Sequence, residues 1–587
     1  MKRMHLGVLL LLSFIFFSCQ KELKVSGIDT PTSPGGSVTL KTTIQGNITD
    51  ENGQPMSGVS IKAGNQTVVT DNHGYFRAKN AIVDANAALV VAEKQGYFKG
   101  YRTFRATSGT NQVMIQMIKK TAAGDVDAAA GGSATLTNGA KIALPANGIV
   151  LANGGTPYTG TVKVYAAYID PTAQNISKVL PGSFMADDKD NKRVVLASYG
   201  MLAVELETPA GVKLQVRSGS EATLTTPIPA LLQASAPSTI SLWYVDEQSG
   251  LWKEQGSATK SGNSYVGTVK HFSFWNCDVS STSINLSMTL RNPEGSPLVH
   301  VLVKLSRTGG AYPSSSYGIT DSLGQVSGAV PSGESLLMEV LDPCYNAVYS
   351  QTVGPFSTAT NLGVISINTP GAHIVTIKGK LLNCSNAPVT NGYAVISFDN
   401  VVRYAAVDAG GNFSIATTSC TTTSGSCDVI GVDNSNLQQS NAVTVPVTIP
   451  VTNAGTIAAC GNSAAVYINY TLDGTSYAIN GIVDSAMMYR DSVQTTGGNN
   501  HLLAMGNHGN DFILFGFTAT ATGTYPLDQL RVQGLTGTVL IPAVNVTLTA
   551  YPQVTGGFFE GSFTGQFQDA LNVTHNINCS FRLRRNW

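Results

Sequence analysis

The segment Gly46-Asn47-Ile48-Thr49-Asp50-Glu51-Asn52-Gly53-Gln54-Pro55 decides the fold class of this chain. Asn52-Gly53 is a turn dipeptide, and Pro55 can begin the next strand at a sheet edge, where no backbone donor is needed. Further on, Asp71-Asn72-His73-Gly74 forms a second turn signal, in which the glycine supplies a positive φ and Phe76 then returns an aromatic side chain to the core. Two such turns between short alternating runs predict a β-sandwich.

The same framework recurs twice downstream. A second copy reads Asn292-Pro293-Glu294-Gly295-Ser296-Pro297, followed by Asp321-Ser322-Leu323-Gly324, although Met288 stands where the other copies have glycine. A third copy runs from Gly379 to Pro388 and continues with Asp408-Ala409-Gly410-Gly411. The Gly-to-Pro spacing is 55 − 46 = 9 in the first copy and 388 − 379 = 9 in the third. The chain therefore contains an internal repeat, and each copy is expected to be one β unit.

The repeat resembles the carboxypeptidase regulatory-like domain, which is a transthyretin-like sandwich of seven strands. The resemblance implies an accessory or scaffold module without catalytic residues of its own. Asp71, Asp321 and Asp408 are accordingly expected to form turns and not to bind calcium or to catalyse a reaction.

A different unit separates the first copy from the second and ends with His271-Phe272-Ser273-Phe274-Trp275-Asn276. It resembles the β-sandwich shared by ankyrins and netrin receptors and related modules of cartilage matrix proteins. Trp243 and Trp252 are expected to pack across a hairpin, and the alternative is that they form a platform for stacking a sugar.

The resemblance also implies an alternative for this closing motif, because the tripeptide His271-Phe272-Ser273 is a self-cleavage site in related sandwiches. Ser273 Oγ would attack the Phe272 carbonyl, and His271 would lie on the same face of a strand as Ser273. Our main expectation is that the chain is no enzyme and has no catalytic residue, cofactor or metal site. It contains no H-E-x-x-H, G-x-S-x-G, P-loop or dinucleotide-binding motif.

The N-terminus predicts export. Lys2 and Arg3 precede an apolar run over residues 6–17, and Ser18-Cys19 follows. This order is typical of a secretory signal, because the run is too short to span a membrane. The stretch before Cys19 resembles a bacterial lipobox, which implies cleavage after residue 18 and lipidation of Cys19. The charged residues 20–22 resemble an export signal of Bacteroidota surface lipoproteins, so we expect a lipid-anchored protein of the outer membrane, exposed at the cell surface.

Composition agrees with this location. The chain has 587 residues, 60 glycines and 12% charged residues, with 36 basic against 36 acidic side chains. Zero net charge argues against a nucleic-acid partner, which requires a basic surface. After Cys19 no run approaches eighteen apolar residues, so the lipid is expected to be the sole membrane contact.

Seven cysteines follow Cys19, and outside the cytoplasm their clustering predicts disulfides rather than zinc ligands. Four lie in the third repeat and allow three pairings. We favour Cys420–Cys427 together with Cys384–Cys460. The remaining three, Cys277, Cys344 and Cys579, are expected to be buried thiols, and the odd count leaves at least one unpaired.

Taken together, the sequence predicts an all-β, multidomain string of β-sandwiches that ends in a β-sandwich or barrel. The expected segments are the signal peptide (1–18), a tether (19–38), the first repeat (39–121), the central sandwich (122–280), the second repeat (281–370), the third repeat (371–462) and a C-terminal unit (463–587). The expected function is that of a non-enzymatic binding or scaffold protein whose distal C-terminal unit meets an extracellular glycan or protein. The alternative is a self-processing protein or an unrecognised extracellular hydrolase.

Overall fold

The structure is a computed structural model that describes residues 38–585 apart from short gaps. The gaps are residues 71–73, 310–313, 368–373, 400, 421–424, 434, 437, 464–465, 481–484, 497–498, 509–510, 533–534, 536–537, 541–543 and 554–557. Cys19, the tether and the turn at Asp71 lie outside the described residues. The described part is almost entirely strand, with one short α-helix, α1 (Ile176–Val179), and one 3-10 turn, η1 (Ala230–Leu232). The all-β, multidomain sandwich architecture predicted from the sequence is confirmed.

The first repeat is a sandwich of two sheets, ordered β4-β1-β7 and β3-β2-β5-β6. Its strands are β1 (Thr39–Thr49), β2 (Ser60–Ala63), β3 (Gln66–Val69), β4 (Tyr75–Asp84), β5 (Ala88–Glu93), β6 (Gly100–Phe104) and β7 (Asn111–Gln116). The central strand β1 runs antiparallel to β4 and parallel to β7. Alternating side chains of both sheets, among them Ile44, Ile48, Ile61 and Val90, fill the space between them.

The second and third repeats share this topology. The second repeat adds β21 (Leu302–Arg307), β22 (Ser315–Ile319), β23 (Gln325–Pro331), β24 (Leu336–Leu341), β25 (Ala347–Val353) and β26 (Thr360–Ser366). The third repeat contains β27 (Ile374–Leu382), β28 (Gly392–Phe398), β29 (Val401–Ala406), β30 (Asn412–Thr418), β31 (Ser426–Asp433), β32 (Gln438–Gln439), β33 (Val443–Pro446), β34 (Val451–Ala458) and β35 (Asn462–Ser463). In both copies the central strand again has one antiparallel and one parallel neighbour.

The predicted turn and proline take the same place in all three repeats. Isolated bridges join Thr49 to Pro55, Arg291 to Pro297 and Leu382 to Pro388. The intervals are 55 − 49 = 6, 297 − 291 = 6 and 388 − 382 = 6, so the three turns are equivalent. The proline therefore stands at the start of the returning chain, where it forms only a single bridge and no ladder.

The central sandwich is built on one long, curled sheet. Its strands are β8 (Ala122–Asp127), β9 (Gly132–Thr135), β10 (Lys141–Leu144), β11 (Ile149–Leu151), β12 (Thr161–Ile169), β13 (Met185–Asp187), β14 (Arg193–Glu207), β15 (Lys213–Val216), β16 (Ala222–Pro227), β17 (Thr239–Val245), β18 (Trp252–Ser261), β19 (Ser264–Val269) and β20 (Phe274–Arg291). Strand β20 pairs with β14 and β17 in this unit and then with β23 and β26 in the second repeat. The predicted boundary at residue 280 therefore falls inside a continuous strand, which joins the two units without a linker.

The C-terminal unit is a single sheet that curls around its own core. Its strands are β36 (Tyr467–Leu472), β37 (Thr475–Asn480), β38 (Ser485–Thr496), β39 (Asn499–His508), β40 (Asp511–Ala519), β41 (Gly523–Val532), β42 (Thr538–Leu540), β43 (Asn545–Ala550), β44 (Phe558–Asp569) and β45 (Thr574–Arg584). Aromatic side chains such as Phe515, Phe563 and Phe581 fill the centre.

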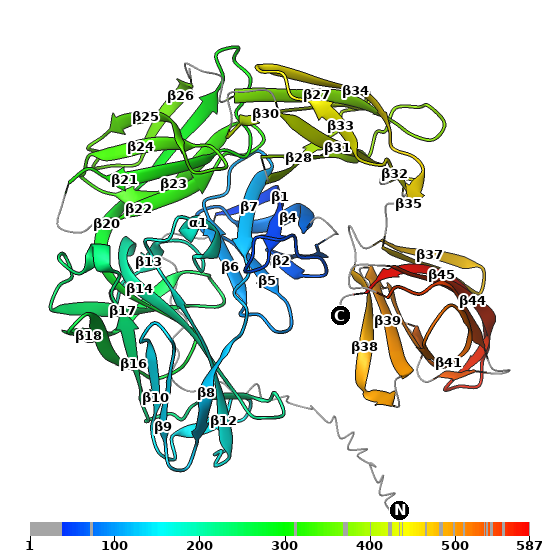
Figure 1. Cartoon of the computed structure of the whole chain (residues 1–587), viewed down its shortest axis with the longest axis horizontal. Helices are drawn as coiled ribbons and strands as arrows, with labels where there is room; N and C mark the ends of the chain where they lie inside the picture. Colours follow the sequence, from blue (N-terminus) through cyan, green and yellow to red (C-terminus); the bar gives the residue numbers. More distant parts are fainter. Residues whose placement is uncertain are drawn as a thin grey trace, which may run out of the picture.

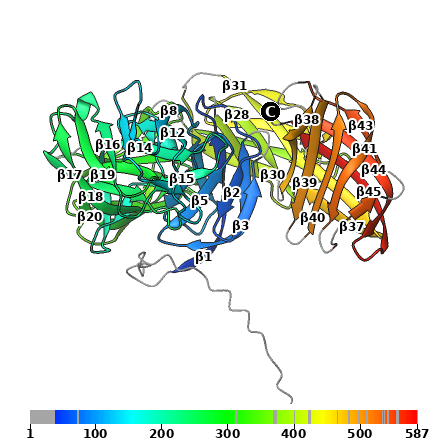
Figure 2. The same cartoon turned by 90° about the horizontal axis from the view of Figure 1, so that it is seen from below.

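The units form an arch and not a straight row (Figure 1). The first repeat lies in the middle, the central sandwich and the second and third repeats surround it, and the C-terminal unit lies at one end; seen from below, all units lie in one layer (Figure 2). No helix in the described part of the chain is long and apolar enough to cross a membrane.

Candidate functional site

The closing motif of the central sandwich lies just before β20 and not within it. His271 and Ser273 are in bends, and the strand begins only at Phe274. The expectation that His271 and Ser273 share one face of a strand is therefore wrong. The reason is that the Phe272 backbone pairs with a side chain from β15 instead of with a neighbouring strand.

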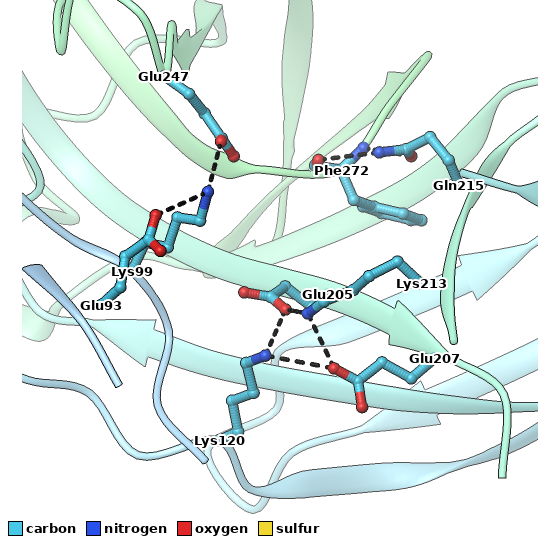
Figure 3. Close-up of polar contacts among 9 residues, drawn as sticks. All are labelled: Glu93, Lys99, Lys120, Glu205, Glu207, Lys213, Gln215, Glu247 and Phe272. Atoms are coloured by element: carbon cyan, nitrogen blue, oxygen red, sulfur yellow. Dashed lines mark hydrogen bonds and ion pairs between the residues drawn. The ribbon is translucent and has the colours of Figure 1, made fainter. Parts of the chain in front are cut away.

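Gln215 holds the Phe272 backbone at both of its polar groups (Figure 3). The Phe272 amide donates to Gln215 Oε1 at 2.7 Å, and Gln215 Nε2 donates to the Phe272 carbonyl at 3.1 Å. The second bond places a donor on the oxygen that would become negative if this carbonyl were attacked. Sequence reasoning missed Gln215, because 57 residues separate it from Phe272.

The other two residues of the tripeptide bond elsewhere. Ser273 Oγ donates to the Phe274 carbonyl at 3.1 Å, and the His271 carbonyl accepts the Trp275 indole N–H at 2.9 Å. The His271 ring packs edge-on against Tyr244, and burial lowers the pKa of His271 to about 4, so the imidazole is neutral at pH 7. A donor is thus present at the Phe272 carbonyl, but the serine hydroxyl is turned away from it. Self-cleavage stays a prediction.

Two clusters of charged side chains join the central sandwich to the first repeat (Figure 3). One cluster contains Lys99, and the other contains Lys120, near the end of the first repeat. Lys99 bridges Glu93 of the first repeat and Glu247 of the central sandwich, at 3.1 and 3.4 Å. Lys120 and Lys213 share the carboxylates of Glu205 and Glu207. Burial raises the pKa of Glu207, but Lys213 and Lys120 outweigh this effect, so that its pKa is lowered overall. These ion pairs hold the first repeat, including its last residues, against the central sandwich.

The disulfides differ in part from the expectation. Cys384 is bonded to Cys460, as predicted, whereas Cys420 is bonded to Cys344 and not to Cys427. The predicted Cys420–Cys427 bond is therefore wrong, and so is the expectation that Cys344 is a buried thiol. The physical reason is that the end of β30 docks beside the turn after β24, which brings the second and third repeats together at this point.

The remaining cysteines, Cys277, Cys427 and Cys579, are free and buried, as predicted for Cys277 and Cys579. Burial raises the pKa of the Cys277 thiol to about 12, and of Cys579 well above its ordinary value. Both are therefore unreactive thiols at neutral pH.

Other sites weighed in the sequence have structural partners. Trp243 and Trp252 lie on the β17–β18 hairpin and are both 0% exposed, so they belong to the core and cannot stack a sugar. Two histidines of the C-terminal unit also lie beside aspartates: His501 Nε2 is 3.0 Å from Asp528, and His575 Nδ1 is 2.7 Å from Asp473. In the described part of the chain, the one grouping with the spacing of a metal site is Asp342, Cys344 and Cys420, and two of its members are used by the disulfide.

The turn aspartates of the repeats form turns as expected. Asp408 accepts the Gly410 and Asn412 amides at 2.8 Å each. Asp321 Oδ1 likewise accepts the backbone amides of Leu323 and Gln325. Its other oxygen, Oδ2, accepts hydrogen bonds from the first repeat, namely from Thr107 Oγ1 at 2.7 Å and from the Gly109 amide at 2.9 Å. The repeat turn of the second copy is thereby docked onto the first copy, which no sequence signal indicated.

Two hollows lie where units meet. A cleft of about 330 Å³ lies between the central sandwich and the second repeat, with Ser198, Lys304, Tyr317 and Tyr345 among its lining residues. A cavity of about 110 Å³ is lined by residues of the first repeat, the central sandwich and the second repeat. Both are products of docking between units.

Comparisons with known proteins reach only part of the chain. No family model matches it. Cartilage intermediate layer protein 2 of Mus musculus is 30% identical over 156 residues, which are 25% of this chain and 13% of that protein; its Homo sapiens counterpart is 27% identical over 127 residues, 21% of this chain and 10% of that protein. The sequence similarity therefore bears on a quarter of this chain at most and on about a tenth of its relatives.

Solved structures match the chain at low similarity. A minor pilin of Streptococcus agalactiae is 10% identical, covers 30% of this chain and 94% of its own, and has a TM-score of 0.14. The major pilin subunit of Bacillus cereus is 10% identical over 71% of this chain and 99% of its own, with a TM-score of 0.12. A DUF3823 family protein from Bacteroides ovatus is 9% identical over 36% of this chain and 98% of its own, with a TM-score of 0.12.

Proposed function

We propose that this protein is a lipoprotein of the Bacteroidota type, anchored through Cys19 to the outer membrane and exposed at the cell surface. It acts as a non-enzymatic scaffold that presents its C-terminal unit to an extracellular glycan or protein. The signal sequence and lipobox support the anchor.

The observation that carries the scaffold role is the packing of four units into one block. Tyr75 of the first repeat stacks on Tyr404 of the third, with ring centroids 3.6 Å apart. Thr103 Oγ1 of the first repeat donates to the Gly250 carbonyl of the central sandwich at 2.7 Å, and Asp321 docks the second repeat. Buried hydrogen bonds between units restrict the movement of one unit relative to another, and a scaffold needs this rigidity.

The C-terminal unit supplies exposed apolar side chains for a partner. Tyr489 on β38 is 39% exposed, and Leu571 at the β44–β45 turn is 77% exposed. Partly exposed aromatic and aliphatic side chains are common anchors in binding surfaces. Other units also expose apolar side chains, among them Leu231 of the central sandwich. The choice of the C-terminal unit as the presenting unit therefore rests on its place at one end of the arch (Figure 1).

The test is a binding screen of the full exported chain against glycan arrays and extracellular protein fractions. Tyr489→Ala and Leu571→Ala are expected to weaken capture of any ligand found. Leu231→Ala is the matched control, because Leu231 is 83% exposed but lies on the central sandwich. A ligand whose capture responds to Leu231 and not to the C-terminal substitutions would contradict the proposal, and so would the absence of any ligand.

A further inference from the structure

The cavity of about 110 Å³ is lined by residues of three units. The first repeat contributes the end of β6, the central sandwich contributes α1 and the residues after it, and the second repeat contributes both of its sheets. Most of the wall is apolar, with Leu286, Met288, Val303 and Val326 among the lining residues.

The charged residues of the lining are all positive. The lining includes two charged residues, Arg102 and Arg105, and no aspartate or glutamate. Arg102 donates to the carbonyls of Met114, Lys178 and Gly182 at 3.0 to 3.3 Å. Among the described residues, no carboxylate lies within ion-pair distance of Arg102. The guanidinium therefore links two units but has no counter-charge.

Arg105 is in a similar position. Its Nε donates to Ser327 Oγ at 3.2 Å and its NH1 donates to Asn86 Oδ1 at 2.6 Å, both neutral acceptors. Burial is the main cause that lowers the pKa of Arg105, Arg193 adds to it, and Asp84 opposes it. Burial also lowers the pKa of Arg102 to about 10. Both side chains remain cationic at neutral pH, so the cavity has a positive potential.

A neutral donor completes the polar side of the cavity. Ser177, on α1, lines the cavity and is 9% exposed. Its hydroxyl has no hydrogen-bond partner in the described part of the chain. A buried hydroxyl without a partner is unfavourable, and a ligand oxygen that accepts its hydrogen bond would remove this cost.

The volume limits the size of the occupant. An apolar cavity of about 150 Å³ accommodates the six carbons of benzene, so a cavity of about 110 Å³ takes roughly four to five carbon atoms of an apolar chain. Cationic groups on one side and hydrocarbon on the other require an occupant with one anionic end and one apolar end.

We propose that this cavity binds a short aliphatic carboxylate, with its carboxylate toward Arg102, Arg105 and Ser177 and its chain against the apolar wall. The site goes beyond the scaffold function and does not depend on it, because it lies between the first three units and not on the C-terminal unit. An occupant here would strengthen the docking of all three units, since each contributes to the wall.

The experiment is calorimetry and saturation-transfer NMR on the full chain with sodium hexanoate. The comparison probes are 1-hexanol, hexylamine and sodium dodecanoate. Hexanoate is expected to bind at least about tenfold more tightly than hexanol, which corresponds to one charge-assisted hydrogen bond. Equal binding of hexanoate and hexanol, or no binding of hexanoate, would overturn the proposal, as would preference for dodecanoate.

Gly328→Leu fills the cavity without disturbing its framework. Gly328 lines the cavity, and a Cβ added there meets no atom within 4 Å. This variant is expected to fold and to lose hexanoate binding. Gly309→Leu is the matched control, since a Cβ there is equally unobstructed but the residue is exposed and outside the lining.

Arg105→Gln tests the charge separately from the volume. It is expected to weaken hexanoate about tenfold while leaving hexanol unchanged. Retained hexanoate binding in Gly328→Leu, or equal loss of both probes in Arg105→Gln, would refute the site.

Discussion

The disulfide between the second and third repeats offers a test with a built-in control. Cys344–Cys420 and Cys384–Cys460 each close a sequence separation of 76 residues. The first crosses from one repeat to the next, whereas the second lies within the third repeat. The perturbation is the double variant Cys344→Ser/Cys420→Ser, compared with Cys384→Ser/Cys460→Ser.

The magnitude follows from the loop that each bond closes. A crosslink of this separation lowers the conformational entropy of the unfolded chain by an amount worth about 4 to 5 kcal/mol. Equal separations predict equal losses of unfolding free energy for the two variants. Loss of the inter-repeat bond has an added effect, because it removes the covalent link between the two repeats. Their junction then depends on noncovalent contacts, such as the hydrogen bond from the Val299 amide to the Ala416 carbonyl at 2.9 Å.

The assay must resolve individual units, because the whole chain does not unfold in one step. The described tryptophans all lie in the central sandwich, so fluorescence would not report on these repeats. Hydrogen-exchange mass spectrometry in increasing denaturant resolves peptides from β21 to β34. Loss of Cys344–Cys420 is expected to destabilise peptides of both repeats, whereas loss of Cys384–Cys460 acts mainly on the third.

The refuting result is specific. If Cys344→Ser/Cys420→Ser leaves both repeats as stable as the wild type while the control variant loses several kcal/mol, the inter-repeat bond is not formed. Non-reducing peptide mapping gives an independent check, because it must show Cys420 linked to Cys344 and not to Cys427.

Four further results are expected. Cys19→Ala should release the protein from the membrane fraction or leave its signal peptide uncut; a processed variant that still pellets with membranes would disprove the anchor. Self-cleavage predicts two bands on a denaturing gel, with a new N-terminus at Ser273, and one band for Ser273→Ala; a single band for both proteins would end that idea. Asp321→Ala should cost about 2 to 4 kcal/mol through unpaired buried donors, whereas Asp408→Ala, in an exposed turn, should cost less than about 1 kcal/mol; hydrogen exchange of peptides from each repeat in increasing denaturant would show the difference. The pKa of His575 is raised, first by its hydrogen bond to an aspartate. The stabilising effect of His575 is therefore complete below its ordinary pKa and is lost as pH rises through the raised value. If His575→Gln keeps the same dependence of thermal stability on pH, His575 is not the group responsible.

The sequence by itself determined the features that depend on short stretches of chain. The spacing from Gly46 to Pro55 predicted three copies of one β unit, because the geometry of a turn is decided by a few adjacent residues. It also predicted Cys384–Cys460, because such a bond would join the first strand of the third repeat to its last strand. Asp321 and Asp408 were recognised as turn formers for the same local reason.

Only the tertiary structure decided how the units meet. Cys344 pairs with Cys420 because two repeats dock, and Asp321 uses its second oxygen to hold another unit. The clamp of Gln215 on Phe272 and the cavity around Arg102 likewise join residues that are distant in sequence. These contacts depend on the orientation of whole sandwiches, which the turn and strand patterns within each unit do not specify.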